Sequence, residues 1–152
     1  MYVKANDIEE LATRLYRLTE VLYRRSGTSA LAVLEESGTT AGQMKALLVL
    51  SGRDPRPLSV GELAEGLSLS LPTASRTADA LRRRGFVQRR VCSEDRRARD
   101  LALTPAGAEL VVRFTDARVA DIRAVVDGLS PEQRERLSAA LSELGVEAPV
   151  AA

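Results

Sequence analysis

A run of arginines in the middle of the chain is the feature whose residue type and spacing most clearly suggest chemistry. Residues 70–99 contain nine arginines against Asp79, Glu94 and Asp95, a net charge of +6, whereas the whole chain carries +1. Arginine binds phosphate oxygens through a planar fork of N–H donors, so this concentration indicates an anionic partner bound at one place. A solvated charged face would have the same composition, and charge alone does not separate the two interpretations.

The residue types that most enzymes require are scarce. The 152-residue chain has no histidine and a single cysteine, Cys92. A Ser-His-Asp triad, a Cys-His pair, a histidine-based zinc site and an intrachain disulfide are therefore excluded within one chain. The sequence also lacks a glycine-rich phosphate loop, so we expect a protein that is not an enzyme and that needs no metal ion or other cofactor.

Length and hydropathy indicate a small globular protein. A chain of 152 residues suits one domain or two small lobes that share a core. No apolar run approaches the roughly 20 residues that cross a bilayer, and the N-terminus lacks the basic start and apolar stretch of a signal peptide. We therefore expect a cytoplasmic protein without membrane contact.

Two helices joined by a tight turn are expected to position the first arginines. Ser59 and Glu62 form a capping-box pattern, which predicts a short helix through Leu67. Ser70 is a suitable N-cap for a second helix, which Gly85 would end. These are the proportions of a helix-turn-helix, in which the second helix enters the major groove of DNA. The candidate DNA-contacting residues of that helix are Ser70, Pro72, Thr73, Ser75 and Arg76.

A charged hairpin is expected to follow this second helix. Residues 86–91 and 101–103 have strand character, and the polar segment between them, 93–100, is typical of a hairpin tip. The tip is too charged to be buried unpaired, and arginine is the preferred side chain in a narrow, electronegative minor groove. A helix in the major groove and a hairpin beside it would form one continuous footprint. The candidate residues of the hairpin are Asp95, Arg96, Arg97 and Arg99.

The sequence before this segment predicts further helices. Residues 7–25 are an amphipathic helix by their apolar spacing, and residues 29–37 are either a short second helix or its continuation after a kink. A capping box at Thr40 and Gln43 predicts a helix ending at Ser51. The residues expected to face inward on that helix are Met44, Leu47 and Leu48. The apolar residues that recur at a spacing of three or four on the first helix are Ile8, Leu11, Ala12, Leu15, Leu18 and Leu22.

The sequence after the hairpin predicts two more helices. A long helix is expected from Thr104 to about Asp127, and a last helix is expected after the capping box at Ser130 and Gln133. Residues Leu137, Ala140, Leu141 and Leu144 would line the inner side of the last helix. The fold class is therefore mainly α, an α+β winged helix with one hairpin.

Residues 59–110 resemble the MarR family of winged-helix regulators. The resemblance rests on GELAEGL in the first helix, SLPTASR at the start of the second, LRRRGFVQRR leading into the hairpin, D-R-R at 95–97, and LALTPAGAEL after it. The flanking helices also match that family in number and order. Two departures are mild: Ser68 stands where glycine is common in the turn, and Ala74 stands where valine is common.

The resemblance implies an architecture and a function. Helices in 1–39 and 105–152 would form a helical dimerisation lobe, and 40–104 would form the DNA-binding lobe, all in one continuous unit. The partners implied are double-stranded DNA with a pseudo-palindromic operator, a second copy of the chain, and a small-molecule effector that releases a repressor. Asp95 would orient Arg97, which enters the minor groove.

Several residues keep more than one interpretation. Tyr16, Tyr23 and Met44 would line an effector pocket or simply pack in the core. Cys92 would serve a redox-responsive regulator or be a small strand residue. We expect one residue among Arg82, Arg83 and Arg84 to contact a phosphate. A winged helix used as a protein-interaction module without DNA binding is the remaining alternative.

Overall fold

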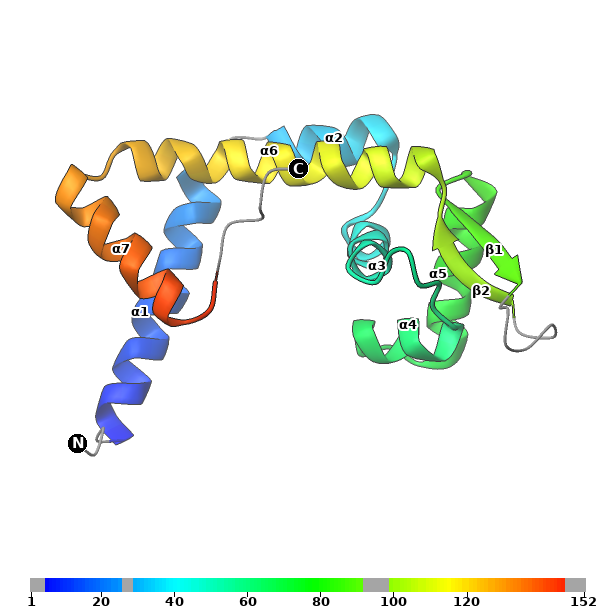
Figure 1. The fold of residues 1–152 in the computed structure, drawn as a ribbon, viewed down its shortest axis with the longest axis horizontal. Coiled ribbons are helices and arrows are strands. Elements are labelled where there is room, and N and C mark those ends of the chain that lie inside the picture. Colours follow the sequence, from blue (N-terminus) through cyan, green and yellow to red (C-terminus); the bar gives the residue numbers. More distant parts are fainter. Residues whose placement is uncertain (1–4, 26–28, 92–98, 147–152) are drawn as a thin grey trace. The chain divides into compact units, whose positions relative to one another are not determined.

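The computed structural model describes residues 5–25, 29–91 and 99–146, and these residues are mainly helical (Figure 1). The antiparallel hairpin of β1 and β2 pairs Val87 with Leu103 and Val91 with Arg99. The predicted fold class is confirmed, because helices surround one small hairpin. The elements are α1 (Ala5–Arg25), α2 (Ser29–Ser37), α3 (Ala41–Ser51), α4 (Val60–Leu67), α5 (Leu71–Arg83), β1 (Val87–Val91), β2 (Arg99–Leu103), α6 (Pro105–Asp127) and α7 (Pro131–Glu143).

The chain forms two compact units. The first contains α1, α7 and the part of α6 from Arg118 onward, and the second contains α2 to β2 with α6 up to Ala117. In the second unit α2 lies along the first part of α6, and the β1–β2 hairpin extends beside α5 (Figure 1). Residues 29–37 therefore form a separate helix, α2, and this helix belongs to the second unit.

Local side-chain bonds determine where α3, α4 and α7 begin. The capping boxes of Thr40 with Gln43, Ser59 with Glu62 and Ser130 with Gln133 are all present, as the sequence predicts. Each satisfies backbone N–H groups that a first helical turn leaves without partners. Ser70 occupies the N-cap of α5, but its hydroxyl makes no capping bond and lies 2.9 Å from the hydroxyl of Thr73.

The core of the second unit is built around α3. Met44 and Leu47 are almost fully buried, as expected, but Leu48 is 38% exposed, and the prediction that it faces inward is wrong. Leu50 takes that place with 4% exposure. The reason is helical geometry: at about 100° per residue, the buried Ala46, Leu47 and Leu50 lie within about 100° of one another, whereas Leu48 lies about 160° from Leu50.

A left-handed backbone conformation occurs at the end of α4 and directly after α5. Ser68 ends α4 in the left-handed conformation at φ 55°, and Gly85 follows α5 at φ 78°. The left-handed region is costly for a residue with a side chain, which is why glycine is usual in such turns. Beyond the turn at 53–57, Leu58 forms a two-bond bridge with Leu101 and so attaches the hairpin to the core.

The apolar faces of the first unit are largely uncovered in the single chain. Leu11 and Leu15 are each 56% exposed, and α7 has no buried residue. The apolar residues that the sequence places on α1 are thus largely exposed among the described residues of the single chain. Among those residues, no helix combines the length and low charge that crossing a membrane requires.

Candidate nucleic-acid interface

The N-terminal half of α5 presents a row of polar side chains that are bonded to one another. The hydroxyl of Thr73 lies 2.9 Å from that of Ser70 and accepts a hydrogen bond of 3.3 Å from Nη2 of Arg76. Ser70, Pro72 and Arg76 are exposed, whereas Thr73 and Ser75 are half-buried. The structure thus brings together the α5 residues that the sequence singles out, on and beside the exposed face of this helix.

The opposite side of α5 is small and apolar. Ala74 and Leu81 are completely buried, and Ala78 is 4% exposed. Residues three and four apart share one face of a helix, so this spacing places the three side chains together against the core. The packing leaves the polar side of α5 free to meet a ligand, and the smaller residue at Ala74 is accommodated without exposure.

A groove beside α5 adds residues that the sequence analysis missed. A cavity of about 380 Å³ lies between the start of α3 and α5. Its lining includes Thr40, Gly42 and Gln43 from the first turn of α3. The capping box at Thr40 was the signal that could have pointed there, since a helix N-terminus favours anions. The groove places that turn next to Thr73 and Arg76.

The arginines after Arg76 differ in whether they have a partner. Asp79 lies 3.7 Å from Nε of Arg82 and 3.6 Å from Nη2 of Arg89, so two cations share one carboxylate. Arg84 donates to backbone carbonyls at the end of α2. The side chains of Arg83 and Arg90 are exposed and make no hydrogen bond or ion pair within the described part of the chain. The free positive charge of this region is therefore smaller than the composition suggests.

The hairpin tip lies beyond the described residues. Asp95, Arg96 and Arg97 fall in 92–98, as does Cys92, and their predicted roles stay predictions. Arg99 begins β2, where its backbone pairs with Val91. The base of the hairpin is held to α6, because the Thr104 hydroxyl donates to the carbonyl of Gly85 at 2.6 Å and the Thr104 N–H donates to that of Phe86 at 3.0 Å.

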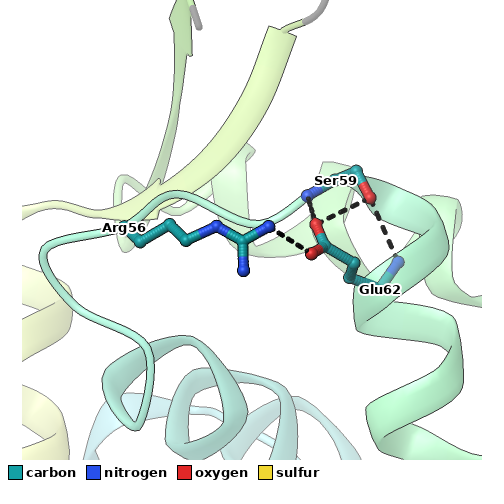
Figure 2. A network of polar contacts seen from close by, with 3 residues as sticks. All are labelled: Arg56, Ser59 and Glu62. Carbon is teal, nitrogen blue, oxygen red and sulfur yellow. Dashed lines mark hydrogen bonds and ion pairs between the residues drawn. The ribbon is translucent and has the colours of Figure 1, made fainter.

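A carboxylate at the start of α4 stabilises the helix that supports α5 (Figure 2). Glu62 Oε2 accepts hydrogen bonds from the backbone N–H and the hydroxyl of Ser59, at 2.9 and 3.0 Å. Its Oε1 lies 2.7 Å from Nη2 of Arg56. The backbone and hydroxyl bonds of Ser59 lower the pKa of Glu62 below its ordinary value. Burial opposes them to a smaller extent, and the charge of Arg56 lowers the pKa further.

The residues considered for an effector pocket lie in different places. Tyr16 lines an open cavity of about 470 Å³ in the first unit, together with Thr19, Glu20, Leu22, Arg24 and Arg118. Met44 is 1% exposed in the core of the second unit, packed with the other apolar residues there. The side chain of Tyr23 lies outside the described residues.

These features define a winged helix-turn-helix: α4 and α5 joined by a tight turn, followed by a two-stranded hairpin whose tip is basic. Residues 37–98 match the sequence profile of the MarR family. Over this segment the chain is therefore similar to the MarR family.

Known proteins with similar sequences and structures agree with this assignment. The chain is 31% identical over 107 residues to the HTH-type transcriptional repressor YetL of Bacillus subtilis, an alignment that covers 70% of this chain and 64% of YetL. It resembles MepR of S. aureus in complex with DNA at 26% identity and a TM-score of 0.68, covering 87% of this chain and 96% of that one. MepR bound to ethidium bromide gives a TM-score of 0.66 at the same identity, covering 87% and 92%.

Proposed function

We propose that this chain is a sequence-specific regulator of transcription that binds duplex DNA as a homodimeric repressor. The observation that carries the proposal is the polar row of Ser70, Thr73 and Arg76 on α5, beside the exposed side chains of Arg83 and Arg90, which have no partner among the described residues. A recognition helix reads base edges with its N-terminal side chains, while cations beside it bind phosphates. The similarity to MepR, which was solved with DNA, supports the same use of these elements.

Two uncovered apolar faces support the homodimer. Ile8, Leu11 and Leu15 on α1 are each more than half exposed, and Leu144 after α7 is 77% exposed. A monomeric soluble protein rarely leaves such a face open to water. A second copy of the chain would cover both faces around a two-fold axis, and two α5 helices would then address a pseudo-palindromic operator.

A small molecule is the proposed signal for release. The cavity lined by Tyr16 has a ring, an aliphatic side chain in Leu22, and charges of both signs from Glu20, Arg24 and Arg118. Such a mixture suits an amphipathic organic molecule. MepR was solved with ethidium bromide, which supports a site for a small organic ligand in this fold.

The experiment begins with selection of bound duplexes from a random library by the full chain. The selected duplex and a scrambled duplex of equal length are then titrated at several salt concentrations. We expect Arg97→Ala to weaken binding of the selected duplex by about 1–3 kcal/mol and to make the salt dependence shallower. If Arg97→Ala binds the selected duplex with unchanged affinity, the predicted role of the hairpin tip is wrong. If the wild type shows no saturable, salt-sensitive binding to DNA, the chain is better explained as a protein-interaction module.

A further inference from the structure

Arg84 ends the recognition helix and contacts a distant part of the chain. Its Nη1 donates to the carbonyl oxygen of Gly38 and its Nη2 donates to that of Ser37, residues that are 46 and 47 positions earlier. These carbonyls end α2, and the last carbonyls of a helix lack partners within it. A cation at this end is also favoured by the helix dipole. The two prongs of one guanidinium thus join the end of α5 to the end of α2.

Gly38 and Phe86 both lie close to the guanidinium of Arg84. Gly38 has φ +57°, and a Cβ added there would lie 2.8 Å from Nη2 of Arg84, so a larger residue would displace the guanidinium. On its other side the guanidinium carbon lies 5.7 Å from the ring centroid of Phe86, within the range of a cation–π interaction. Three separate groups therefore determine where this side chain lies.

A second set of contacts holds the same segment from Thr104, the residue before α6, and from α6 itself. Thr104 bonds to the carbonyls of Gly85 and Phe86, directly after Arg84. Arg113 on α6 forms an ion pair of 2.6 Å with Glu36 on α2. The ends of α2 and α5, the start of β1 and the first part of α6 are thereby connected in a closed ring of contacts.

We propose that Arg84 is a positioning residue for DNA recognition, which sets the orientation of α5 and of the hairpin through the carbonyls of Ser37 and Gly38 instead of binding a phosphate. The inference rests on the proposed function. Two carbonyls hold the guanidinium of Arg84 in a fixed orientation toward the end of α2, and its loss would let α5 and the hairpin shift relative to α2. Sequence-specific contacts need exact placement, whereas non-specific attraction to phosphates depends mainly on charge.

The neighbouring residue provides a matched control. Arg83 lies one position earlier, is exposed, and has no hydrogen-bond or ion-pair partner among the described residues. Arg83→Gln removes the same charge as Arg84→Gln without breaking an internal contact. Arg84→Lys keeps the charge but loses the planar fork, since lysine cannot donate in the bidentate geometry of arginine.

The experiment measures dissociation constants of the full chain for the selected duplex and for a scrambled duplex across a salt series. We expect Arg84→Gln and Arg84→Lys to weaken binding of the selected duplex, by about tenfold for glutamine, which corresponds to about 1.4 kcal/mol. Binding of the scrambled duplex and the salt slope should stay at wild-type values for Arg84→Lys, which keeps the charge, and should change less for Arg84→Gln than for Arg83→Gln. Circular dichroism at the temperature of the titration verifies that each variant is folded.

The outcomes separate the proposal from its alternatives. Arg83→Gln is the reference for the loss of a phosphate contact. Such a loss would weaken binding of both duplexes equally and reduce the salt slope by about 0.9. The same pattern in Arg84→Gln would overturn the proposal, and so would wild-type affinity in both Arg84 variants. If Arg84→Gln does not fold, Arg84→Lys decides alone. Failure of the wild type to bind any duplex would instead contradict the proposed function.

Discussion

Asp79 of the recognition helix lies 3.6 Å from Arg89 of the hairpin, measured between Oδ1 and Nη2. The same oxygen lies 3.7 Å from Nε of Arg82. One carboxylate therefore connects α5 to β1 and partly neutralises two arginines of the basic segment. The side chains of both ion pairs are at least one-third exposed, so each pair contributes little to the stability of the fold. The neutralisation of the two arginines matters instead for DNA binding.

Replacement of this carboxylate should make the protein less selective. We expect Asp79→Asn to strengthen binding of a scrambled duplex several-fold at low salt and to steepen the salt slope by about 1 per additional phosphate contact, because Arg82 and Arg89 lose their partner. Titrations of the selected and scrambled duplexes measure the ratio of the two affinities, which should fall. Asp116→Asn on α6 removes an equal charge at an exposed position and is the control. An equal response in both variants would show a simple effect of net charge.

The carboxylate of Glu62 should give the fold a pH-dependent contribution to stability. Its pKa is lowered from the ordinary 4.5, mainly by the backbone and hydroxyl bonds of Ser59 and then by Arg56. A lowered pKa in the folded chain means that the contribution is complete above the unfolded pKa and is lost as the pH falls through the folded one. It should therefore be present at neutral pH and disappear in the acid range below about 4.5.

Glu62→Gln tests this contribution, because glutamine can keep the capping box while losing the charge, as Gln43 and Gln133 do in α3 and α7. We expect the free energy of unfolding in urea to fall by about 0.3–1 kcal/mol at pH 7, the usual effect of a charge at a helix start. The difference from the wild type should shrink toward zero as the pH falls below the folded pKa. Glu65→Gln, at an exposed position of the same helix, should show no such pH dependence.

Two glycines in helices should respond to alanine with opposite signs. A Cβ on Gly107 of α6 would overlap the carbonyl oxygen of Phe86, whereas a Cβ on Gly42 of α3 would meet nothing closer than 4.0 Å. Alanine normally stabilises a helix by up to about 1 kcal/mol relative to glycine. We expect Gly42→Ala to be neutral or stabilising and Gly107→Ala to destabilise by about 1–3 kcal/mol through overpacking. Thermal unfolding measures both, and a stabilised Gly107→Ala would contradict the close approach.

The proposed homodimer predicts that a charge on the exposed side of α1 has a large effect on association. Leu15 is 56% exposed in the single chain. Burial of a leucine contributes about 1.5–3 kcal/mol, and a two-fold interface contains each residue twice, so Leu15→Glu should raise the dimer dissociation constant by about 100-fold or more. Sedimentation equilibrium measures the change. Leu48→Glu, at an exposed position of the second unit, is the control and should leave the association state unaltered. If the wild-type protein sediments as a monomer, the proposed dimer is contradicted.

The sequence was sufficient for features that depend on neighbours along the chain. The capping boxes begin at Thr40, Ser59 and Ser130 as predicted, because their bonds join residues three positions apart. The end of α5 before Gly85 and the placement of Ser70 to Arg76 at the start of that helix follow from the same local rules. The family resemblance extended these elements to a winged helix.

Only the tertiary structure decided which charges of the basic segment remain available. Composition treats the arginines as equivalent, yet Arg82 and Arg89 share Asp79, Arg84 is bound to α2 carbonyls 46 and 47 residues away, and Arg83 has no partner among the described residues. Such contacts arise when distant elements pack together, and no spacing along the chain encodes them. The bridge between Leu58 and Leu101 and the outward position of Leu48 have the same origin, since packing around α3 selects which apolar residues are covered.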